Sequence, residues 1–131
     1  MRKAASIPLF PFSYRMPVNV VFGSGRIQDL KSLLEALSIR RPLIVAGRRS
    51  ARASGALAAV RSQAPESAVF DDVEENPSSE TCGRAAAAAL AHNADGVIAL
   101  GGGSPMDVAK AAAGLAMNGG ACTAYYGRDK F

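Results

Sequence analysis

The stretch Gly101-Gly102-Gly103-Ser104-Pro105-Met106-Asp107-Val108-Ala109-Lys110 decides the fold of this 131-residue chain. A short apolar run rich in β-branched residues precedes it at 96–100, and strong helix formers follow it at 108–117. These flanks predict a strand and a helix joined by a glycine turn. The three glycines remove every Cβ from the turn, so a bulky anion can approach the backbone. Because the start of the helix also favours negative charge, the unit predicts a phosphate-binding turn.

Ser104 and Asp107 also fit a purely structural interpretation. The pattern Ser-x-x-Asp before an apolar run is close to a capping box, with Pro105 at the first helical position. Both side chains would then only complete the end of the helix, and the sequence leaves the two interpretations open for Asp107. The triple glycine is different, because a structural strand-to-helix turn needs one glycine and rarely three.

Three further pairs of a strand and a helix precede this unit. The run Pro42-Leu43-Ile44-Val45-Ala46 is apolar throughout, as a buried parallel strand should be. Ser78 or Ser79 is expected to cap the helix that follows it. The resulting order βαβαβαβα is typical of a parallel α/β sheet with right-handed crossovers. Before the glycine turn, strands are expected at 18–22, 42–46 and 68–70, and helices at 26–37, about 54–62 and 79–93.

Three other features receive structural interpretations. Gly23-Ser24-Gly25 matches the first two glycines of a G-x-G-x-x-G fingerprint, but Gln28 stands where the third would be. We interpret it as a turn rather than as a phosphate loop. The acidic segment 71–77 is interpreted as a solvated connection, and His92, the only histidine, as a residue near a helix end.

Composition limits the classes of protein that fit. Hydrophobic residues make up 49% and charged residues 20%, which is typical of one globular domain. The net charge of +4 comes from scattered basic residues without a nucleic-acid-binding motif, so no nucleic-acid partner is expected. No apolar run is long enough to cross a membrane. Cys82 and Cys122 form no C-x-x-C pair, which fits a reducing compartment, and a cytoplasmic protein is expected.

The motif at 101–110 closely resembles the signature of the iron-dependent (group III) alcohol dehydrogenases. The resemblance covers 18–131 and implies a Rossmann-like parallel sheet with flanking helices that binds NAD or NADP. It also implies an oxidoreductase that moves a hydride between a small alcohol or aldehyde and the cofactor, with Fe²⁺ or another divalent metal held by a C-terminal helical domain. Shorter pieces that agree with the family in order lie at 22–26, 75–78, 118–120 and 125–131.

The same resemblance assigns residues to the cofactor. Asp107 matches an aspartate near the nicotinamide end, and Asn76 matches a loop residue close to the cofactor. The residues that match the pyrophosphate turn are Gly101, Gly102, Gly103 and Ser104.

The stretch Gly47-Arg48-Arg49-Ser50 follows the second expected strand. The family commonly places an aspartate there, which binds the 2′-hydroxyl of NAD and repels the 2′-phosphate of NADP. Gly47 takes the place of that aspartate, Arg48 or Arg49 could pair with a phosphate, and Ser50 could donate to it. The alternative is a loop of solvated arginines. We expect a preference for NADP over NAD.

The chain does not supply the whole family pattern. Prolines predict an extended arm over 1–17, and 18–131 is expected to be a truncated dinucleotide-binding domain without the C-terminal metal-binding helical domain. One histidine cannot provide the metal ligands of the family, so no catalytic or metal-binding residue is assigned. The fragment alone is expected to be inactive, and its assembly into a homo-oligomer is left open.

Two other functional hypotheses stay open. Glycerol dehydrogenases and dehydroquinate synthases share the fold and the glycine turn, although they usually carry lysine where this chain has Ser104. The second is a non-catalytic nucleotide-binding module. Metal dependence would separate the two enzyme classes, and the gene sequence after Phe131 would separate an enzyme from a module.

Overall fold

The computed structural model describes residue 13 and residues 15–127. The expected arm over 1–17 therefore lies largely outside the described residues. In chain order the elements are η1 (Arg26–Asp29), α1 (Leu30–Ala36), β1 (Pro42–Gly47), α2 (Ser50–Ala53), α3 (Ala56–Gln63), β2 (Ala68–Val73), α4 (Ser79–His92), β3 (Gly96–Leu100), α5 (Gly103–Asn118) and η2 (Cys122–Tyr125).

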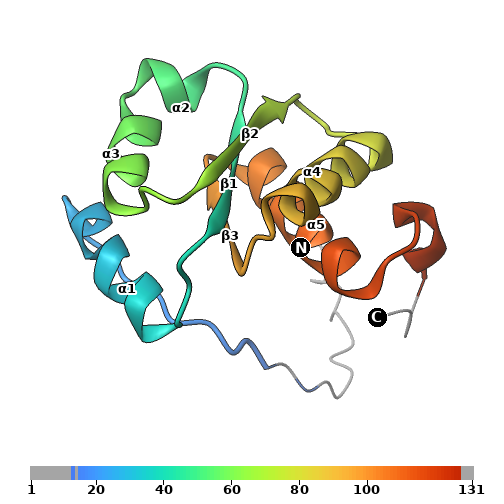
Figure 1. Ribbon diagram of the computed structural model, residues 1–131, viewed down its shortest axis with the longest axis horizontal. Helices are drawn as coiled ribbons and strands as arrows, with labels where there is room; N and C mark the ends of the chain where they lie inside the picture. Colours follow the sequence, from blue (N-terminus) through green and yellow to red (C-terminus); the bar gives the residue numbers. More distant parts are fainter. Residues whose placement is uncertain (1–12, 14, 128–131) are drawn as a thin grey trace, which may run out of the picture.

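Three parallel strands form the sheet, in the order β2-β1-β3 (Figure 1). The central strand β1 places Leu43 opposite Ala68 of β2 on one side and opposite Val97 of β3 on the other. Residues 42–46 of β1 are all buried, which agrees with their continuous apolar sequence. The expected Rossmann-like α/β fold is therefore confirmed.

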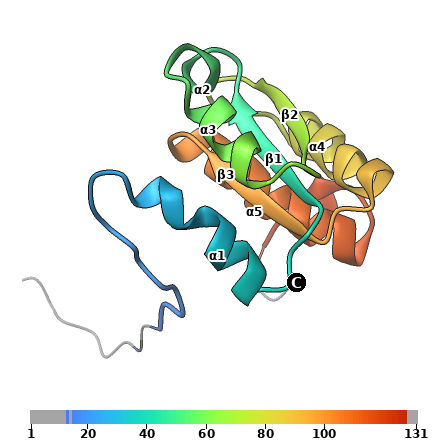
Figure 2. The same ribbon diagram turned by 60° about the vertical axis from the view of Figure 1, so that its left-hand side comes forward.

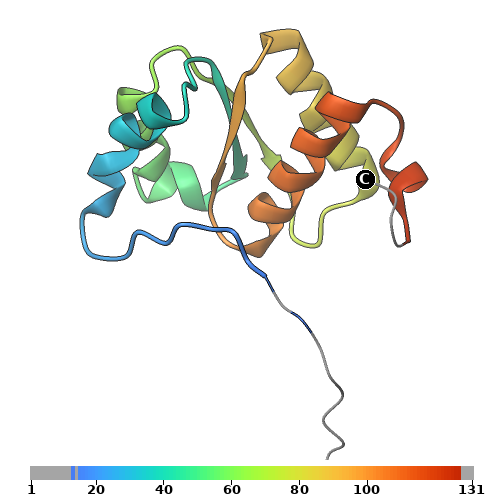
Figure 3. The same ribbon diagram turned by 90° about the horizontal axis from the view of Figure 1, so that it is seen from below.

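Helices cover both faces of the sheet (Figure 3). Leu43 and Val45 of β1 pack in a core with α4 and α5, whereas Ile44 and Ala46 pack in a second core with α2 and α3. Successive side chains of a strand point to opposite faces, so β1 contributes to both cores in alternation. The sheet is consequently the middle layer of three.

Small side chains fill the contact between α4 and α5. Ala85 on α4 and Ala112 on α5 are both fully buried, in the same cluster as Val108 and Leu115. Alanine leaves little bulk between two helices, so the two axes can pack closely against each other and against the sheet. The alanine-rich sequence of α4 is therefore a packing feature.

Replacing Ala85 with leucine should overfill this contact. Its accessible surface is 0%, so three extra carbon atoms must displace neighbours, and we expect a loss of about 1–3 kcal/mol in the free energy of unfolding. Urea denaturation of the purified chain measures the loss. Ala87→Leu is the matched control, because Ala87 lies on the same helix and is exposed. Equal denaturation midpoints for the two variants would contradict this packing argument.

The strand expected at 18–22 is wrong. Residues 15–22 belong to no helix or strand, and Val20 and Phe22 are 78% and 95% exposed. Figure 2 shows this segment as a trace that is not joined to the sheet. Apolar β-branched residues fit a pleated surface, but a strand forms only where a neighbour completes its hydrogen-bond ladder. No described strand pairs with 18–22, so the expected βαβαβαβα order lacks its first strand here.

Two boundaries also differ from expectation. Strand β2 continues to Val73, so Asp71 and Asp72 belong to the strand rather than to a solvated acidic loop. Arginines pair with both carboxylates, which offsets the cost of placing charges on the strand. The short helix α2 occupies part of the expected connection after β1.

The expectations for Ser78 and His92 are confirmed. Ser78 caps α4, because its Oγ accepts a hydrogen bond from the Thr81 amide at 3.2 Å. His92 lies in the last turn of α4, where its Nε2 is 2.8 Å from the carbonyl oxygen of Glu66.

Cys82 and Cys122 are free thiols. Among the described residues, no helix has the length and apolar character needed to span a membrane.

Candidate functional site: a groove at the carboxyl ends of the strands

A groove of about 570 Å³ lies where the three strands end. The carboxyl ends of parallel strands meet at one edge of a sheet, and α/β proteins bind ligands at that edge. Each strand is followed by residues of the lining, so the sheet itself positions the groove. The lining consists of Gly47 at the end of β1 with Arg48 and Arg49 after it, Val73 at the end of β2 with Glu74 and Glu75 after it, and 102–105 after β3.

The glycine turn forms one wall of this groove. Gly101 has a φ of +137°, and a Cβ there would lie 3.0 Å from Pro105 Cγ, so the local backbone requires glycine. Gly102 is different, because its backbone is extended and a Cβ would meet no atom within 4 Å. The protein's own packing therefore explains Gly101 but leaves Gly102 free to admit a ligand close to the backbone.

Helix α5 begins at Gly103, and no side chain caps its first turn. The capping-box interpretation of Ser104 and Asp107 is therefore wrong, because the glycine backbone starts the helix two residues earlier than Pro105. The first amides of a helix have no acceptor within the helix, and Gly103 and Ser104, which begin α5, line the groove. Together with the helix dipole they favour an anion at this position.

Ser104 and Asp107 separate in the structure. Ser104 lines the groove, whereas Asp107 is not among the lining residues. The Asp107 side chain is 74% exposed, and its Oδ1 lies 3.7 Å from Lys110 Nζ. Such exposed ion pairs one helical turn apart contribute little to stability, so the contact with Lys110 does not explain why position 107 carries an aspartate.

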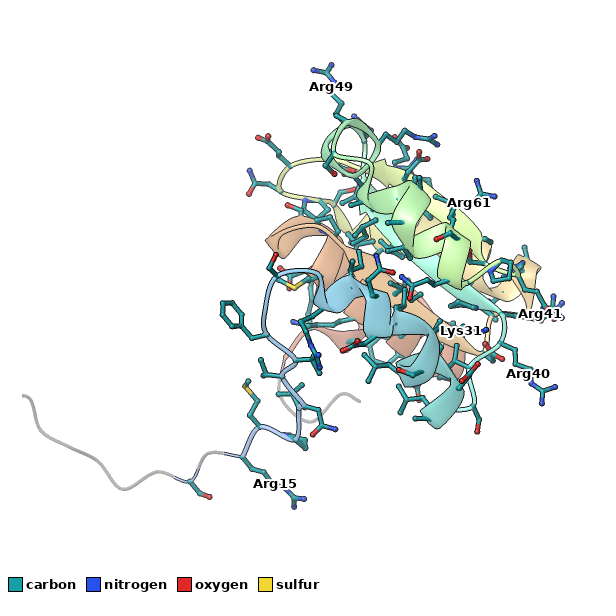
Figure 4. All side chains as sticks on the ribbon, turned by 90° about the vertical axis from the view of Figure 1, so that its left-hand side faces the viewer. Arg15, Lys31, Arg40, Arg41, Arg49 and Arg61 are labelled. Carbon is teal, nitrogen blue, oxygen red and sulfur yellow. The ribbon has the colours of Figure 1, made fainter. Side chains whose placement is uncertain are left out.

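The opposite wall carries two arginines with different surroundings. Arg48 Nε donates to Asp72 Oδ1 at 2.7 Å. Arg49 forms no ion pair with any carboxylate of the described residues, and Figure 4 shows its side chain extending away from the ribbon. Gly47 ends β1 and Ser50 begins α2, so both belong to the same connection. The structure therefore brings the expected arginines to the groove and leaves one of them unpaired.

Asp72 and Arg84 were not singled out from the sequence. Arg84 Nη1 donates to Asp72 Oδ2 at 2.6 Å, and the pKa of the Asp72 carboxyl is lowered by its hydrogen bonds to Arg84 and Arg48. Arg84 also lies 5.8 Å above the Phe70 ring. The sequence did contain a signal for Asp72, because two acids directly follow the apolar residues of β2. Interpreting 71–77 as an acidic loop placed these two acids outside the strand.

Glu74 fixes the loop between β2 and α4. Its Oε1 accepts from Thr81 Oγ1 at 2.6 Å and from the Ser78 amide at 3.2 Å. The hydrogen bond from Thr81 is the main reason why the pKa of Glu74 falls to about 2, so this carboxylate is charged at neutral pH. Glu74 is thus a structural anion of the lining that sequence analysis assigned to solvent.

Asn76 is exposed and is not among the lining residues, although Glu74 and Glu75 are. Its φ of +52° lies in the left-handed region, which asparagine tolerates better than most residues. Gly23 lies outside this groove and lines a separate apolar one. Its position agrees with the interpretation of 23–25 as a turn rather than a phosphate loop.

Comparison with known proteins decides the family. The model of the iron-containing alcohol dehydrogenases matches residues 17–131. This chain belongs to the iron-containing alcohol dehydrogenase family. It is 39% identical over 102 residues to 4-hydroxybutyrate dehydrogenase of Cupriavidus necator, covering 77% of this chain and 27% of that protein.

The proteins similar to this chain include one named as NADPH-dependent and one named as NADH-dependent. The NADPH-dependent butanol dehydrogenase of Clostridium saccharobutylicum is 30% identical over 75% of this chain and 25% of its own length. The crystal structure of NADH-dependent butanol dehydrogenase A from Thermotoga maritima superposes with a TM-score of 0.82 at 28% identity, covering 88% of this chain and 30% of that one. The chain thus spans about a quarter to a third of these relatives, and the alignment falls on the N-terminal part of the family's structures.

Proposed function

We propose that this chain forms the nicotinamide-cofactor-binding part of an alcohol dehydrogenase that interconverts a small alcohol and its aldehyde. The observation that carries the proposal is the open space at Gly102 beside the uncapped first turn of α5. A pyrophosphate would lie against that backbone, where free amides and the helix dipole stabilise its charge. The bound nicotinamide supplies the hydride chemistry, and these residues hold and orient the cofactor.

The adenosine end of the cofactor would lie toward the connection after β1. Gly47 places no carboxylate there, and Arg49 offers an unpaired guanidinium. A 2′-phosphate would therefore meet a cation and no repelling aspartate at this position, which supports a preference for NADP over NAD. The sequence also offers the Ser50 hydroxyl as a donor to this phosphate, but the Ser50 side chain lies outside the described residues.

The described residues do not fit a catalytic metal. His92 is the only histidine of the chain, and no three His, Cys, Asp or Glu side chains in the described part gather closely enough to hold an ion. No step proposed here therefore passes through a metal bound to these residues. We propose that Fe²⁺ or another divalent metal of the complete enzyme is held by other residues. The two free cysteines fit a reducing compartment such as the cytoplasm.

Titration of the complete gene product with NADPH and with NADH tests the proposal directly. Saturable binding of at least one cofactor is expected, together with turnover of a primary alcohol when metal is present. Nicotinamide fluorescence measures the binding. Absence of binding to both cofactors would contradict the proposed function.

The purified 131-residue chain should show no alcohol oxidation, even with added Fe²⁺ or Zn²⁺. The reason is that the chain has one histidine, and the carboxylates within the described residues gather into no site that could hold a metal and polarise an alcohol oxygen. Absorbance of the reduced nicotinamide records the reaction, and the complete gene product under the same conditions is the control. Metal-dependent turnover by the short chain would overturn this prediction.

A further inference from the structure

One carboxylate on β2 is shared by two arginines from different elements. Asp72 Oδ1 accepts from Arg48 Nε at 2.7 Å, and Asp72 Oδ2 accepts from Arg84 Nη1 at 2.6 Å. Arg84 is held in place further, because its Nη2 donates to Thr81 Oγ1 at 3.1 Å and its guanidinium lies over the Phe70 ring. Asp72 is therefore anchored from α4 on one side while it holds Arg48 on the other.

The neighbouring acid of the same strand has a different partner. Asp71 pairs with Arg52 of α2, and neither residue lines the groove. Arg48 does line the groove, next to Arg49. Of the two acids on β2, Asp72 alone thus acts on a cation of the lining.

We propose that Asp72 determines coenzyme specificity by holding the Arg48 guanidinium away from the cofactor, which leaves Arg49 as the cation that binds the 2′-phosphate. The inference rests on the proposed function and deepens it. A guanidinium that already donates to a carboxylate has lost part of its capacity for a second anion. The charge of Asp72 also lies beside Arg48, where it weakens the attraction for a phosphate.

Arg84 moderates this effect. With Arg84 present, Asp72 divides its two oxygens between two guanidinium groups, and the three side chains together carry a net charge of +1. Without Arg84, both oxygens would be available to Arg48, and the local net charge would fall to zero. Removing the charge of Asp72 and removing the charge of Arg84 should therefore shift specificity in opposite directions.

The variants Asp72→Asn and Arg84→Gln test the inference in the complete gene product. Asp72→Asn should increase the affinity for NADPH by about threefold to tenfold and change that for NADH by less than about twofold. Arg84→Gln should decrease the NADPH affinity by about threefold, again with little effect on NADH. Nicotinamide fluorescence gives the dissociation constants, and circular dichroism verifies that each variant is folded.

Two controls separate the local effect from a change in net charge. Asp71→Asn makes the same chemical change one residue earlier on β2 and should alter neither cofactor affinity by more than about twofold. In an Arg48→Ala background, Asp72→Asn should have no effect on NADPH beyond that limit, because the side chain through which Asp72 acts is missing.

Equal shifts for Asp72→Asn and Asp71→Asn would overturn the inference, as would an Asp72→Asn effect that persists without Arg48. Either result leaves the proposed function intact if Gly102→Val still removes cofactor binding. Failure of the proposed function gives a different result, since the protein would then bind neither cofactor or would bind both independently of Gly102.

Discussion

Gly102→Val is expected to lower the affinity of the complete gene product for NADPH and NADH by more than about a hundredfold, without loss of the fold. The branched side chain would occupy the space through which the pyrophosphate reaches the first amides of α5. Both cofactors contain the same pyrophosphate, so both should be lost together. The valine side chain would thus block the bound pyrophosphate without disturbing the packing of the protein itself.

The fold should survive because Gly102 has no structural need for glycine. Its φ of −84° lies outside the left-handed region that excludes branched side chains, and an added Cβ meets no protein atom within 4 Å. Gly101→Val would not separate binding from folding, because its φ is +137° and Pro105 lies 3.0 Å from the added Cβ. The adjacent glycines therefore differ as experimental targets.

Titration with each cofactor, followed by nicotinamide fluorescence, measures the loss. Gly83→Val is the matched control, since Gly83 is exposed on α4, has open space around its Cβ position and lies outside the groove. This variant should bind both cofactors like the parent protein, apart from a small loss of helix stability. Equal affinities for Gly102→Val and the parent would show that the turn is only structural.

The sequence predicted those elements whose local signals and burial agree. Strands β1 and β3 are short apolar runs that lie in or beside the core, and α4 has both a capping serine and an alanine-rich buried face. The segment 18–22 has the same composition as a strand, yet it forms none. A strand forms only when its backbone hydrogen-bonds to a neighbouring strand, and the composition of 18–22 does not indicate whether such a strand is present.

The sequence predicted where the candidate site lies, but it did not predict how the charged side chains around it are paired. Three glycines after an apolar run located the turn, but the start of α5 at Gly103 depends on backbone angles that side-chain patterns do not encode. Asp72 and Glu74 were assigned to solvent because consecutive acids are typical of loops. Their partners Arg48, Arg84 and Thr81 are far enough along the chain that only the paired strands and α4 bring them together.

The complete gene product is expected to bind NADPH more tightly than NADH, and Arg49→Ala should remove most of the difference. We expect a loss of about tenfold to a hundredfold in NADPH affinity and almost none in NADH affinity, because only the 2′-phosphate would pair with this guanidinium. Arg48→Ala should cost less than about threefold, since Asp72 already engages that arginine at 2.7 Å. The sequence allowed either arginine, and the contacts favour Arg49.

The carboxylates of Glu74, which lines the groove, and of Asp72, which pairs with the lining residue Arg48, do not reverse this expectation. Glu74 is charged, but Thr81 and the Ser78 amide already donate to it, and Asp72 is neutralised by two guanidinium groups. Arg61→Ala is the control for loss of a surface charge, because Arg61 is exposed on α3 and lies outside the lining (Figure 4). Fluorescence titration of the three arginine variants with both cofactors gives the comparison. Tighter binding of NADH by the parent protein, or equal loss of both cofactors in Arg49→Ala, would rule out a 2′-phosphate contact at this arginine.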